Sequence, residues 1–478
     1  MAEFINNNIR KLENGELLSE LEINVFDIFS KTCSLFNNKK VVARVAGGWV
    51  RDKLLGGESD DIDFALENAS GEEFALKMKE IADIKLQLNP AQSQQLESAK
   101  VCLFNSVWID ICQLRCDEYS ENSRIPTIRI GTPYEDSVRR DITINCLYFN
   151  INTKKVEDLC DGIPDLIGSV ARTPIDPFLS FGDDPLRILR TFRFASRFNL
   201  TVSENIMKAA SSRLKELQTK VTHPRIEMEL HKALNGPDPF NYIKRLIDSN
   251  LFYFIFDEFH EWNLNEQQVI ERTRISKEII SNLFNSNNSS TSMINFANTF
   301  SQIFNNADNR YSIALATVYY SLADFENVPD PVKKSKNISA LECAIVRRIH
   351  ATLDVFKCAN KTILASKSLD SIINNVNRVT VGQWLMNVGE FWPLSYSICF
   401  DNAKLSFFEN ILIPFIEAEK LDGVWKLKPI IDGKTLATIH GVKPGPMIAK
   451  LTKELIDWQL ANPTGTVEDY KTFVTTSK

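Results

Sequence analysis

The sequence predicts an α+β protein in which a head built on a small mixed β-sheet precedes an all-α neck, body and tail. Strand-like patterns, namely β-branched runs and polar–apolar alternation, lie between Val41 and Leu159. From Pro185 onward apolar residues such as Leu189 and Phe192 recur at helical spacing. No convincing strand pattern and no fixed-period repeat follow, so we expect the sheet to be confined to the head.

The composition is typical of a soluble globular protein. The chain has 478 residues, of which 44% are hydrophobic and 24% charged, which excludes wholesale disorder and a collagen-like repeat. No apolar run reaches the ~18 residues of a membrane span, and the N-terminus lacks the residue order of a signal or transit peptide. We expect a cytoplasmic protein with no membrane partner. Nuclear and mitochondrial pools stay open, because an upstream start could add a transit peptide.

The charge and the cysteines narrow the class of partner and the compartment. The net charge of −6 excludes a whole-chain basic footprint for nucleic acid, whereas local arginine clusters could still bind phosphate. The nine cysteines are an odd number without paired spacing. We therefore expect buried thiols in a reducing compartment.

The elements of the head can be assigned in chain order. The polar segment Arg115–Asp136 contains Pro126, Gly131 and Pro133, which predicts a mobile loop. The other expected elements are a strand at Val41–Val45, a helix at Trp49–Leu55, a strand at Asp61–Ala65, two strands within Val101–Leu114, a strand or buried helix at Ile142–Phe149, and a hairpin partner from Lys154 to Leu159.

Helical periodicity continues after the head through Ser203–Leu217 and Arg225–Leu234. The segment Asn282–Asn309 is rich in Asn and Ser, so we expect a long surface loop between body helices. Within it, Phe296–Phe304 stays open as a helix.

Two motifs in the head point to phosphate and metal chemistry. The pair Gly47-Gly48 between a strand and a helix lets the backbone approach a ligand closely, and the helix start behind it favours an anion. Arg51, one turn into the helix, can add a charged fork. Asp61 and Asp63, two residues apart on a strand, would face the same side and repel unless a divalent cation lies between them. Mg²⁺ prefers one or two carboxylates with phosphate oxygens, so the combination predicts a metal–phosphate site.

Asp110 supplies a third carboxylate on an apolar strand, where an unpaired charge would be costly. A neighbouring strand that places Asp110 beside Asp61 and Asp63 would complete a two-metal site. One metal would then hold a triphosphate and the other would activate a 3′-hydroxyl for in-line attack. The alternative is an edge-strand Asp that faces water.

The run Gly47–Leu66 resembles the signature of the class II tRNA nucleotidyltransferases, the CCA-adding enzymes, within the polymerase-beta-like superfamily. The resemblance is strong from Val41 to Leu234 and resumes near the C-terminus, where it is closest to the eukaryotic, yeast-like type. The further blocks that carry it are Arg139–Asn145, Asp158–Arg172, Asp183–Phe194, Lys428–Lys434, Lys443–Pro446 and Asn462–Thr466.

This resemblance implies a set of domains and of site residues. The domains would be a catalytic head at 1–175, a nucleotide-recognition neck at 176–235, a helical body at 236–400 and a tRNA-binding tail at 401–478. Asp61 and Asp63 would bind two Mg²⁺ ions, with Asp110 as the third catalytic acid. The nucleotide would be bound by Gly47, Gly48, Arg51, Arg139, Arg140, Asp141, Asn145, Asp184, Arg187, Arg190 and Arg193.

Asp184 and Arg187 suggest how a protein could read the base. Cytosine and adenine both present an amino donor beside a ring-nitrogen acceptor, which a carboxylate next to a guanidinium complements. Uracil and guanine invert this pattern, and each buried mismatch costs a few kcal/mol. Arg190 and Arg193 would then face the triphosphate or the RNA backbone. The alternative is an amphipathic helix with a solvated ladder of ion pairs.

The remaining matches concern flexibility and RNA. Arg124, Gly131 and Thr132 match the family's flexible loop, which in the family helps the switch from C to A addition. Lys443 and Gly445, ahead of a helix, could bind an RNA phosphate; a plain interhelical turn is the alternative. One departure from the family pattern is Pro224, which stands where an acid is usual before Arg225. Trp425 and Trp458 are expected in the core.

We therefore expect a template-independent enzyme that adds C, C and A to the 3′ end of tRNA. Its partners would be the tRNA 3′ end, CTP, ATP and two Mg²⁺ ions, with no DNA and with a monomer favoured. The alternatives are a bacterial-type poly(A) polymerase, a partial enzyme that adds only CC or only A, and an inactive RNA-binding relative.

Overall fold

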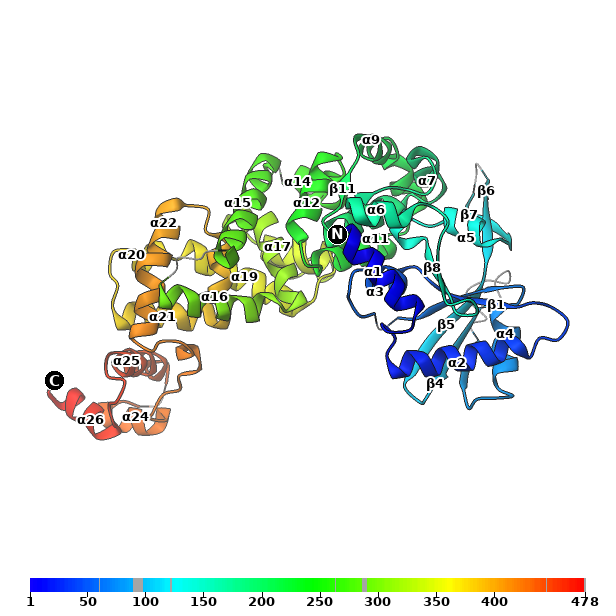
Figure 1. The fold of residues 1–478 in the computed structure, drawn as a ribbon. Helices are drawn as coiled ribbons and strands as arrows, with labels where there is room; N and C mark the ends of the chain where they lie inside the picture. Colours follow the sequence, from blue (N-terminus) through cyan, green and yellow to red (C-terminus); the bar gives the residue numbers. More distant parts are fainter. Residues whose placement is uncertain are drawn as a thin grey trace. The chain divides into compact units, whose positions relative to one another are not determined.

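The computed structural model describes residues 1–59, 61–88, 98–120, 123–262, 264–285, 290–443 and 445–476. The chain divides into two compact units, one of Met1–Leu230 with Asp248–Phe254 and one of His231–Ile247 with Ile255–Lys478. The large sheet belongs to the first unit, and the second is almost entirely helical (Figure 1). The predicted fold class is confirmed, and the finer division into head, neck, body and tail stays a prediction.

The first unit is built on a seven-stranded mixed sheet. Across the sheet the strands are β3 (Lys85–Leu88), β4 (Ala99–Leu103), β5 (Val107–Gln113), β2 (Asp63–Glu67), β1 (Val42–Ala46), β8 (Leu147–Asn150) and β9 (Lys155–Asp158). Only β2 and β5 are parallel neighbours; the other pairs are antiparallel. The predicted strands are thus present, displaced by one or two residues, and Ile142–Phe149 contains a short 3₁₀ turn before β8.

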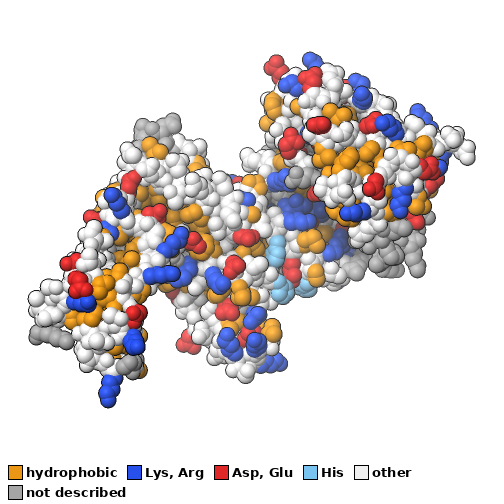
Figure 2. All heavy atoms as spheres, turned by 90° about the horizontal axis from the view of Figure 1, so that it is seen from below, with side chains coloured by type: hydrophobic (Ala, Val, Ile, Leu, Met, Phe, Trp, Pro, Cys, Tyr) orange, Lys and Arg blue, Asp and Glu red, His pale blue; other side chains and the backbone are white. Residues whose placement is uncertain are grey.

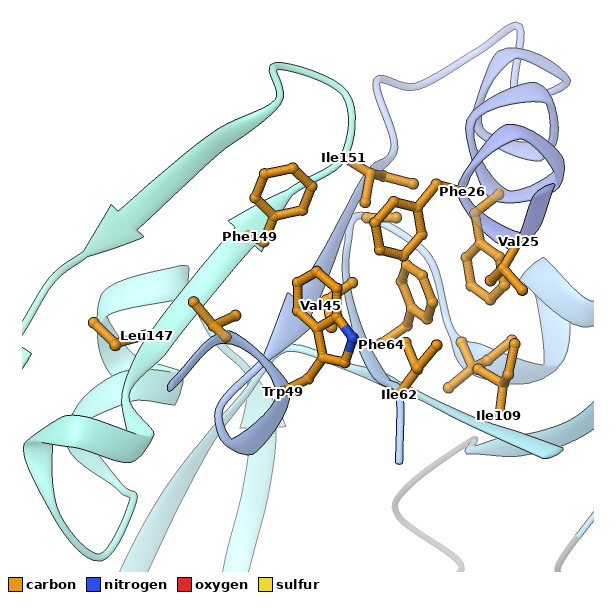
Figure 3. Close-up of a cluster of buried hydrophobic side chains, with 14 of the residues drawn as sticks. Val25, Phe26, Val45, Trp49, Ile62, Phe64, Ile109, Leu147, Phe149 and Ile151 are labelled. Atoms are coloured by element: carbon orange, nitrogen blue, oxygen red, sulfur yellow. The ribbon is translucent and has the colours of Figure 1, made fainter. Parts of the chain in front are cut away.

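Aromatic side chains fill the core between this sheet and the helices α2 (Glu20–Ser34) and α4 (Gly71–Met78). Phe29 of α2 stacks on Phe64 of β2 with ring centroids 3.7 Å apart, and Phe26 packs edge-on against Trp49 at 5.6 Å. Figure 3 shows Phe26, Trp49, Phe64 and Phe149 gathered in this cluster. Full burial of each such side chain stabilises the fold by roughly 1.5–3 kcal/mol, so the core fixes the strands that carry the site.

The segment Arg115–Asp136, expected as a loop, is mostly regular structure. It forms a two-stranded hairpin of β6 (Arg115–Ser120) and β7 (Ser123–Ile130), and the helix α5 (Pro133–Val138) follows. The expectation was wrong because a hairpin that joins no larger sheet leaves little hydrophobic alternation in the sequence. The start of α5 was readable, since Thr132 and Glu135 form a capping box.

Short helices connect the sheet to the second unit, as the periodicity predicted. They are α6 (Gly162–Gly168), α7 (Pro177–Asp183), α8 (Leu186–Arg197), α9 (Glu204–Ser212), α10 (Leu214–Lys220) and α11 (His223–Leu234). A parallel pair of two-residue strands, β10 (Val170–Ala171) and β11 (Thr201–Val202), ties the segment before α7 to the end of α8. Helix α1 (Ala2–Glu13) packs beside α3 (Gly48–Leu54).

Among the residues described from Pro239 onward, the only strands are the two-residue pair β12 (Val328–Pro329) and β13 (Asn337–Ile338), which the sequence did not reveal. The helices are α12 (Pro239–Asp248), α13 (Phe252–Ile255), α14 (Glu258–Glu261), α15 (Glu266–Asn285), α16 (Thr291–Phe304), α17 (Ala307–Val318), α18 (Ala340–Glu342), α19 (Leu353–Lys367), α20 (Asp370–Ile373), α21 (Arg378–Val388), α22 (Asn402–Phe407), α23 (Ile413–Ala418), α24 (Gly433–His440), α25 (Met447–Ala461) and α26 (Val467–Thr476).

The Asn- and Ser-rich segment Asn282–Asn309 is another correction. Most of it is helical, because α15 extends to Asn285 and α16 covers Thr291–Phe304. Phe296, Phe300 and Phe304, spaced by one helical turn, are buried along α16. Packing of this stripe outweighs the weak helix propensity of Asn and Ser, and the helical alternative for Phe296–Phe304 is confirmed.

The last three helices share a small core of their own, in which Trp458 packs edge-on against Tyr470 at 5.2 Å. Trp458 is therefore a core residue, as expected. The cysteines are free thiols, with Cys112 and Cys116 partly exposed and the others buried. Within the described part of the chain, no helix has the length and apolar character needed to cross a membrane.

Candidate active site

A cavity of about 420 Å³ opens within the first unit where β1 ends and α3 begins. That volume lies in the range of small-molecule sites. Its lining is strongly polar and consists of Ala46, Gly47, Gly48, Arg51, Asp63, Arg115, Asp117, Arg139, Arg140, Asp141, Asn145, Asp184, Arg187, Arg190 and Phe194. The lining includes six arginines, four aspartates and the small residues Ala46, Gly47 and Gly48. This composition suits an anionic ligand that also has a polar head group.

Gly47 makes the turn that shapes one wall of the cavity. Its φ of +68° lies in the left-handed region, and a Cβ there would come within 2.9 Å of Arg140 Nη1 and 3.1 Å of Asn145 O. The Gly47 N–H donates to Leu147 O at 2.8 Å, which joins the turn to β8. Glycine is therefore required both for the backbone conformation and for the close approach of Arg140.

A chain of hydrogen bonds links the Gly47 turn to α8. Arg51 donates to Asn145 Oδ1, and Asn145 Nδ2 donates to Asp141 Oδ1 at 2.9 Å. Arg190 Nε donates to the other oxygen of Asp141, also at 2.9 Å. Burial alone would raise the pKa of Asp141, but the charge of Arg190 and these hydrogen bonds lower it. The carboxylate is ionised and holds Asn145 and Arg190 in fixed positions.

Asp136 of α5 organises the two neighbouring arginines. Arg139 donates to its Oδ1 from Nε at 2.9 Å and from Nη2 at 2.6 Å, while Arg140 Nη2 donates to Oδ2 at 2.9 Å. Tyr148 OH donates to Oδ2 as well, and the Arg115 N–H lies 3.3 Å from Oδ1. Although burial favours the neutral acid, the charges of Arg140 and Arg139 lower the pKa of Asp136. Asp136 thus ties the base of the hairpin to both arginines.

The three predicted catalytic acids are only partly brought together. Asp63 lies opposite Asp110 in the parallel β2–β5 register, and Asp61 precedes β2. Partial burial, with the negative charges of Asp110 and Asp61, raises the pKa of Asp63. Asp63 and Asp110 are both exposed, but only Asp63 lines the cavity, and Asp110 Oδ2 is 3.2 Å from Lys100 Nζ.

The fit of a metal to these acids rests on Asp61 and Asp63. Within the described residues, no three His, Cys, Asp or Glu side chains lie close enough together to hold a metal ion. A site with two carboxylates, completed by phosphate oxygens, agrees with the preference of Mg²⁺. Burial raises the pKa of Asp63 most, and the negative charges of Asp110 and Asp61 raise it further; a cation would relieve this repulsion.

The predicted face of Asp184, Arg187, Arg190 and Arg193 needs correction. Asp184 precedes α8 rather than lying on it, and its Oδ1 accepts from the Leu186 N–H at 3.1 Å. The Arg187 guanidinium donates to Ser180 O at 3.2 Å and to Arg139 O at 2.6 Å. All three of Asp184, Arg187 and Arg190 still line the cavity.

Arg193 does not line the cavity. Its Nε donates to Glu229 of α11 at 2.6 Å, and Arg190 Nη1 reaches the same carboxylate at 3.3 Å. Both Arg193 and Glu229 are buried. A buried ion pair of this kind fixes α8 against α11, so the expectation that Arg193 faces a triphosphate or RNA is not met.

Gly131 and Thr132 are not among the residues that line the cavity. The side chain of Arg124 is outside the described residues. Gly131 packs tightly against Arg115, where a Cβ would meet the Arg115 carbonyl carbon at 2.5 Å, and Thr132 caps α5. In the second unit, Gly445 O accepts from Ile448 N–H at the start of α25, and Lys443 precedes it.

Sequence reasoning missed Asp136, Arg115 and Asp117. Arg115 Nε lies 3.1 Å from Asp117 Oδ1 on the cavity wall. The hairpin strand β6 places both residues there, and the segment was taken for a loop. Arg115 and Asp117 are two residues apart, so their side chains share one face of a strand. This spacing was the feature of the sequence that could have indicated the strand. Asp136 belongs to the acidic first turn of α5, but nothing in the sequence indicated its arginine partners.

Comparisons with known proteins agree with this geometry. Residues 43–172 match the family model described as the poly A polymerase head domain, and residues 199–263 match the probable RNA and SrmB-binding site of polymerase A. The mitochondrial CCA tRNA nucleotidyltransferase of Saccharomyces cerevisiae is 30% identical, over 95% of this chain and 92% of the relative. The tRNA nucleotidyltransferase cca2 of Schizosaccharomyces pombe is 31% identical, over 95% and 97%.

The fold is shared with a solved structure as well. The Thermotoga maritima CCA-adding enzyme complexed with tRNA matches with a TM-score of 0.67, over 98% of each chain and at 22% identity.

Proposed function

Because the chain belongs to the CCA-adding tRNA nucleotidyltransferases, of which two yeast relatives match it over nearly its whole length, we propose that it adds C, C and A to the 3′ end of tRNA. CTP and ATP are the substrates, and no nucleic-acid template is needed. The observation that carries this proposal is the arginine-lined cavity at the Gly47 turn, with Asp63 in its wall. Such a cavity would bring guanidinium groups able to bind phosphate next to a carboxylate able to hold a metal ion.

The triphosphate is held by Arg51, Arg139, Arg140 and Arg190. These guanidinium groups line one cavity, and Asp136 and Asp141 fix three of them by charge-assisted hydrogen bonds. Because their positions are set before the nucleotide arrives, little side-chain entropy is lost on binding. The open Gly47 and Gly48 backbone lets the phosphates approach β1 closely.

Asp61 and Asp63 would hold Mg²⁺, and Asp110 lies next to Asp63 as the third acid. When bound, the two ions supply charge neutralisation for the triphosphate and a lowered pKa for the tRNA 3′-hydroxyl. The chain's own residues orient the substrates: the arginines fix the triphosphate, so that the 3′-oxygen attacks the α-phosphorus and pyrophosphate leaves.

Asp184 and Arg187 read the base. A carboxylate accepts the amino group of C or A, and a guanidinium donates to the adjacent ring nitrogen. Support comes from their shared place in the cavity wall. Arg187 is held by Ser180 and Arg139 O, so its orientation depends on the same segment that carries the triphosphate arginines.

The second unit holds the tRNA, with Lys443 and Gly445 at the start of α25 as contacts to its backbone. We expect a monomer in the cytoplasm, with mitochondrial and nuclear pools as further sites of action. On the face that Figure 2 shows, Lys and Arg side chains are scattered among Asp and Glu side chains with local gatherings. Such gatherings, rather than one continuous basic face, would bind the RNA.

The alternatives make different products from defined primers. Purified protein is incubated with tRNAs that end before CCA, after the first C and after the second C, each with one labelled nucleotide. We expect CTP to be used on the first two primers and ATP only on the third. Repeated use of ATP on every primer would indicate a poly(A) polymerase. Use of only one nucleotide would indicate a partial enzyme, and no use of either nucleotide would indicate an inactive relative.

A further inference from the structure

A short loop in the second unit presents three lysines together. Lys333, Lys334 and Lys336 lie between β12 and β13, and all three side chains are exposed. We call the segment Asp330–Lys336 the lysine hairpin. The chain as a whole is acidic, with a net charge of −6, so a local group of three positive charges stands apart from its surroundings.

The lysine hairpin is held in one conformation by its own backbone and by Arg347. The Asp330 N–H donates to Lys336 O at 2.8 Å, and the Lys336 N–H donates to Lys333 O at 2.8 Å. Asp330 is buried and accepts two hydrogen bonds from Arg347, at 3.0 and 2.8 Å. These bonds from Arg347 lower the pKa of Asp330 to about 2.

Arg347 neutralises the charge of Asp330. The charge that the lysine hairpin presents to solvent therefore comes from its three lysines. Within the part of the chain that the structure describes, none of the three forms an ion pair. Other lysines of the same unit do, such as Lys277 with Asp238 at 2.8 Å and Lys404 with Asp370 at 2.7 Å. Like charges held close together without a carboxylate repel one another, and an anion would relieve that repulsion.

We propose that the lysine hairpin binds the sugar–phosphate backbone of tRNA. The inference rests on the proposed function and goes beyond it by naming a contact outside the tail. Lysines are mobile point charges, suited to phosphates whatever the base sequence. The backbone bonds hold the three exposed lysines within one short turn, so several phosphates could be neutralised at once and their counterions released.

The test compares three variants of the full-length protein with the wild type. K333A/K334A/K336A removes the charges, and K333R/K334R/K336R keeps them. K40A/K79A/K215A removes three exposed lysines of the first unit that likewise form no ion pair among the described residues, so its net charge changes equally. The Kd for tRNA lacking CCA is measured over a series of salt concentrations, and the KM for CTP is measured at saturating tRNA.

We expect the alanine variant to bind tRNA about tenfold more weakly at low salt, with a slope of log Kd against log salt reduced by about 2–3. The arginine variant and the K40A/K79A/K215A control should bind like the wild type, and the KM for CTP should not change. Equal tRNA affinity of the alanine variant and the wild type, or an equal loss in the control, would overturn the proposal while leaving the proposed function intact. A wild type that neither binds nor extends tRNA would overturn both.

Discussion

Asp63 on β2 lies directly opposite Asp110 on the parallel neighbour β5. Two carboxylates at opposed positions of one sheet are unfavourable unless something positive accompanies them. Here the pKa of Asp63 is raised by partial burial and by the charges of Asp110 and Asp61. Lys100 already contacts Asp110, so we expect a cation to be held by Asp61 and Asp63.

The first prediction concerns these acids. Asp61→Ala or Asp63→Ala should lower incorporation of both C and A by a factor on the order of 100–1,000 or more, because both additions use one metal-binding pair. Binding of tRNA, measured by filter retention, should persist. The exposed Asp83→Ala serves as a control, and near-normal C addition by Asp63→Ala would refute the assignment.

The second prediction concerns Asp136. Asp136→Asn keeps the shape but removes the charge that balances Arg139 and Arg140, so the KM for CTP and the KM for ATP should both rise about tenfold, with kcat changing less. The fold should lose about 1–3 kcal/mol, measured by urea unfolding. Asp83→Asn, at an exposed position of the same unit, is the control. A loss of stability with unchanged KM values would make Asp136 purely structural.

The third prediction uses Gly47. Gly47→Ala adds the strain of a left-handed backbone, about 1–2 kcal/mol, and pushes a Cβ toward Arg140. Gly15→Ala is the matched control, because Gly15 has a φ of +83° but open space around it. Both variants should lose stability by thermal unfolding, and Gly47→Ala should lose more, because its Cβ also meets Arg140 Nη1 and Asn145 O. Only Gly47→Ala should raise the KM for both nucleotides, and equal KM values in the two variants would contradict the role of Gly47.

The fourth prediction concerns the β6–β7 hairpin. Replacing residues 119–126 by Asn-Gly joins Glu118 to Thr127, which are cross-strand partners, through a two-residue turn. The base of the hairpin, with Arg115 and Asp117, is retained. If the outer hairpin takes part in the change of nucleotide preference, A addition should fall more than C addition in single-turnover assays. An equal fall in both would favour general destabilisation.

The fifth prediction concerns the base. Asp184→Ala removes the acceptor for the amino group of C and A and also the penalty against UTP. Discrimination should fall by roughly 1–3 kcal/mol per contact, or about ten- to a hundredfold, in competition between CTP and UTP. The companion Arg187→Ala should act on the neighbouring ring nitrogen. A variant that loses activity but keeps its original ratios would assign Asp184 a structural role.

The local features of the site could be read from the sequence, since each depends on neighbours in the chain. The turn at Gly47, the helix after it and the strand of Asp63 all follow from residue type and spacing. A neighbouring strand that brings Asp110 beside Asp63 was expected, and an Asp110 that faces water was the stated alternative. The parallel direction of that strand and the contact of Asp110 with Lys100 were not expected.

The missed features depend on contacts between distant segments. In the sequence, Arg193 has the same residue type and helical spacing as the other arginines of α8. Its ion pair with Glu229 depends on the packing of α11, which the sequence does not show. Asp136 gathers Arg115, Arg140 and Tyr148 from separate elements, which no periodicity can show. The hairpin was hidden for the related reason that it buries no face against the larger sheet.

The central claim is that this one chain builds the complete CCA end. The most direct measurement is to react the purified full-length protein with a tRNA that lacks CCA, in the presence of all four nucleotides, and to sequence the 3′ ends. The account predicts that C, C and A are added in that order and that extension stops there. Ends that carry a run of A, CC alone or any added U or G, or that remain unextended, would contradict it.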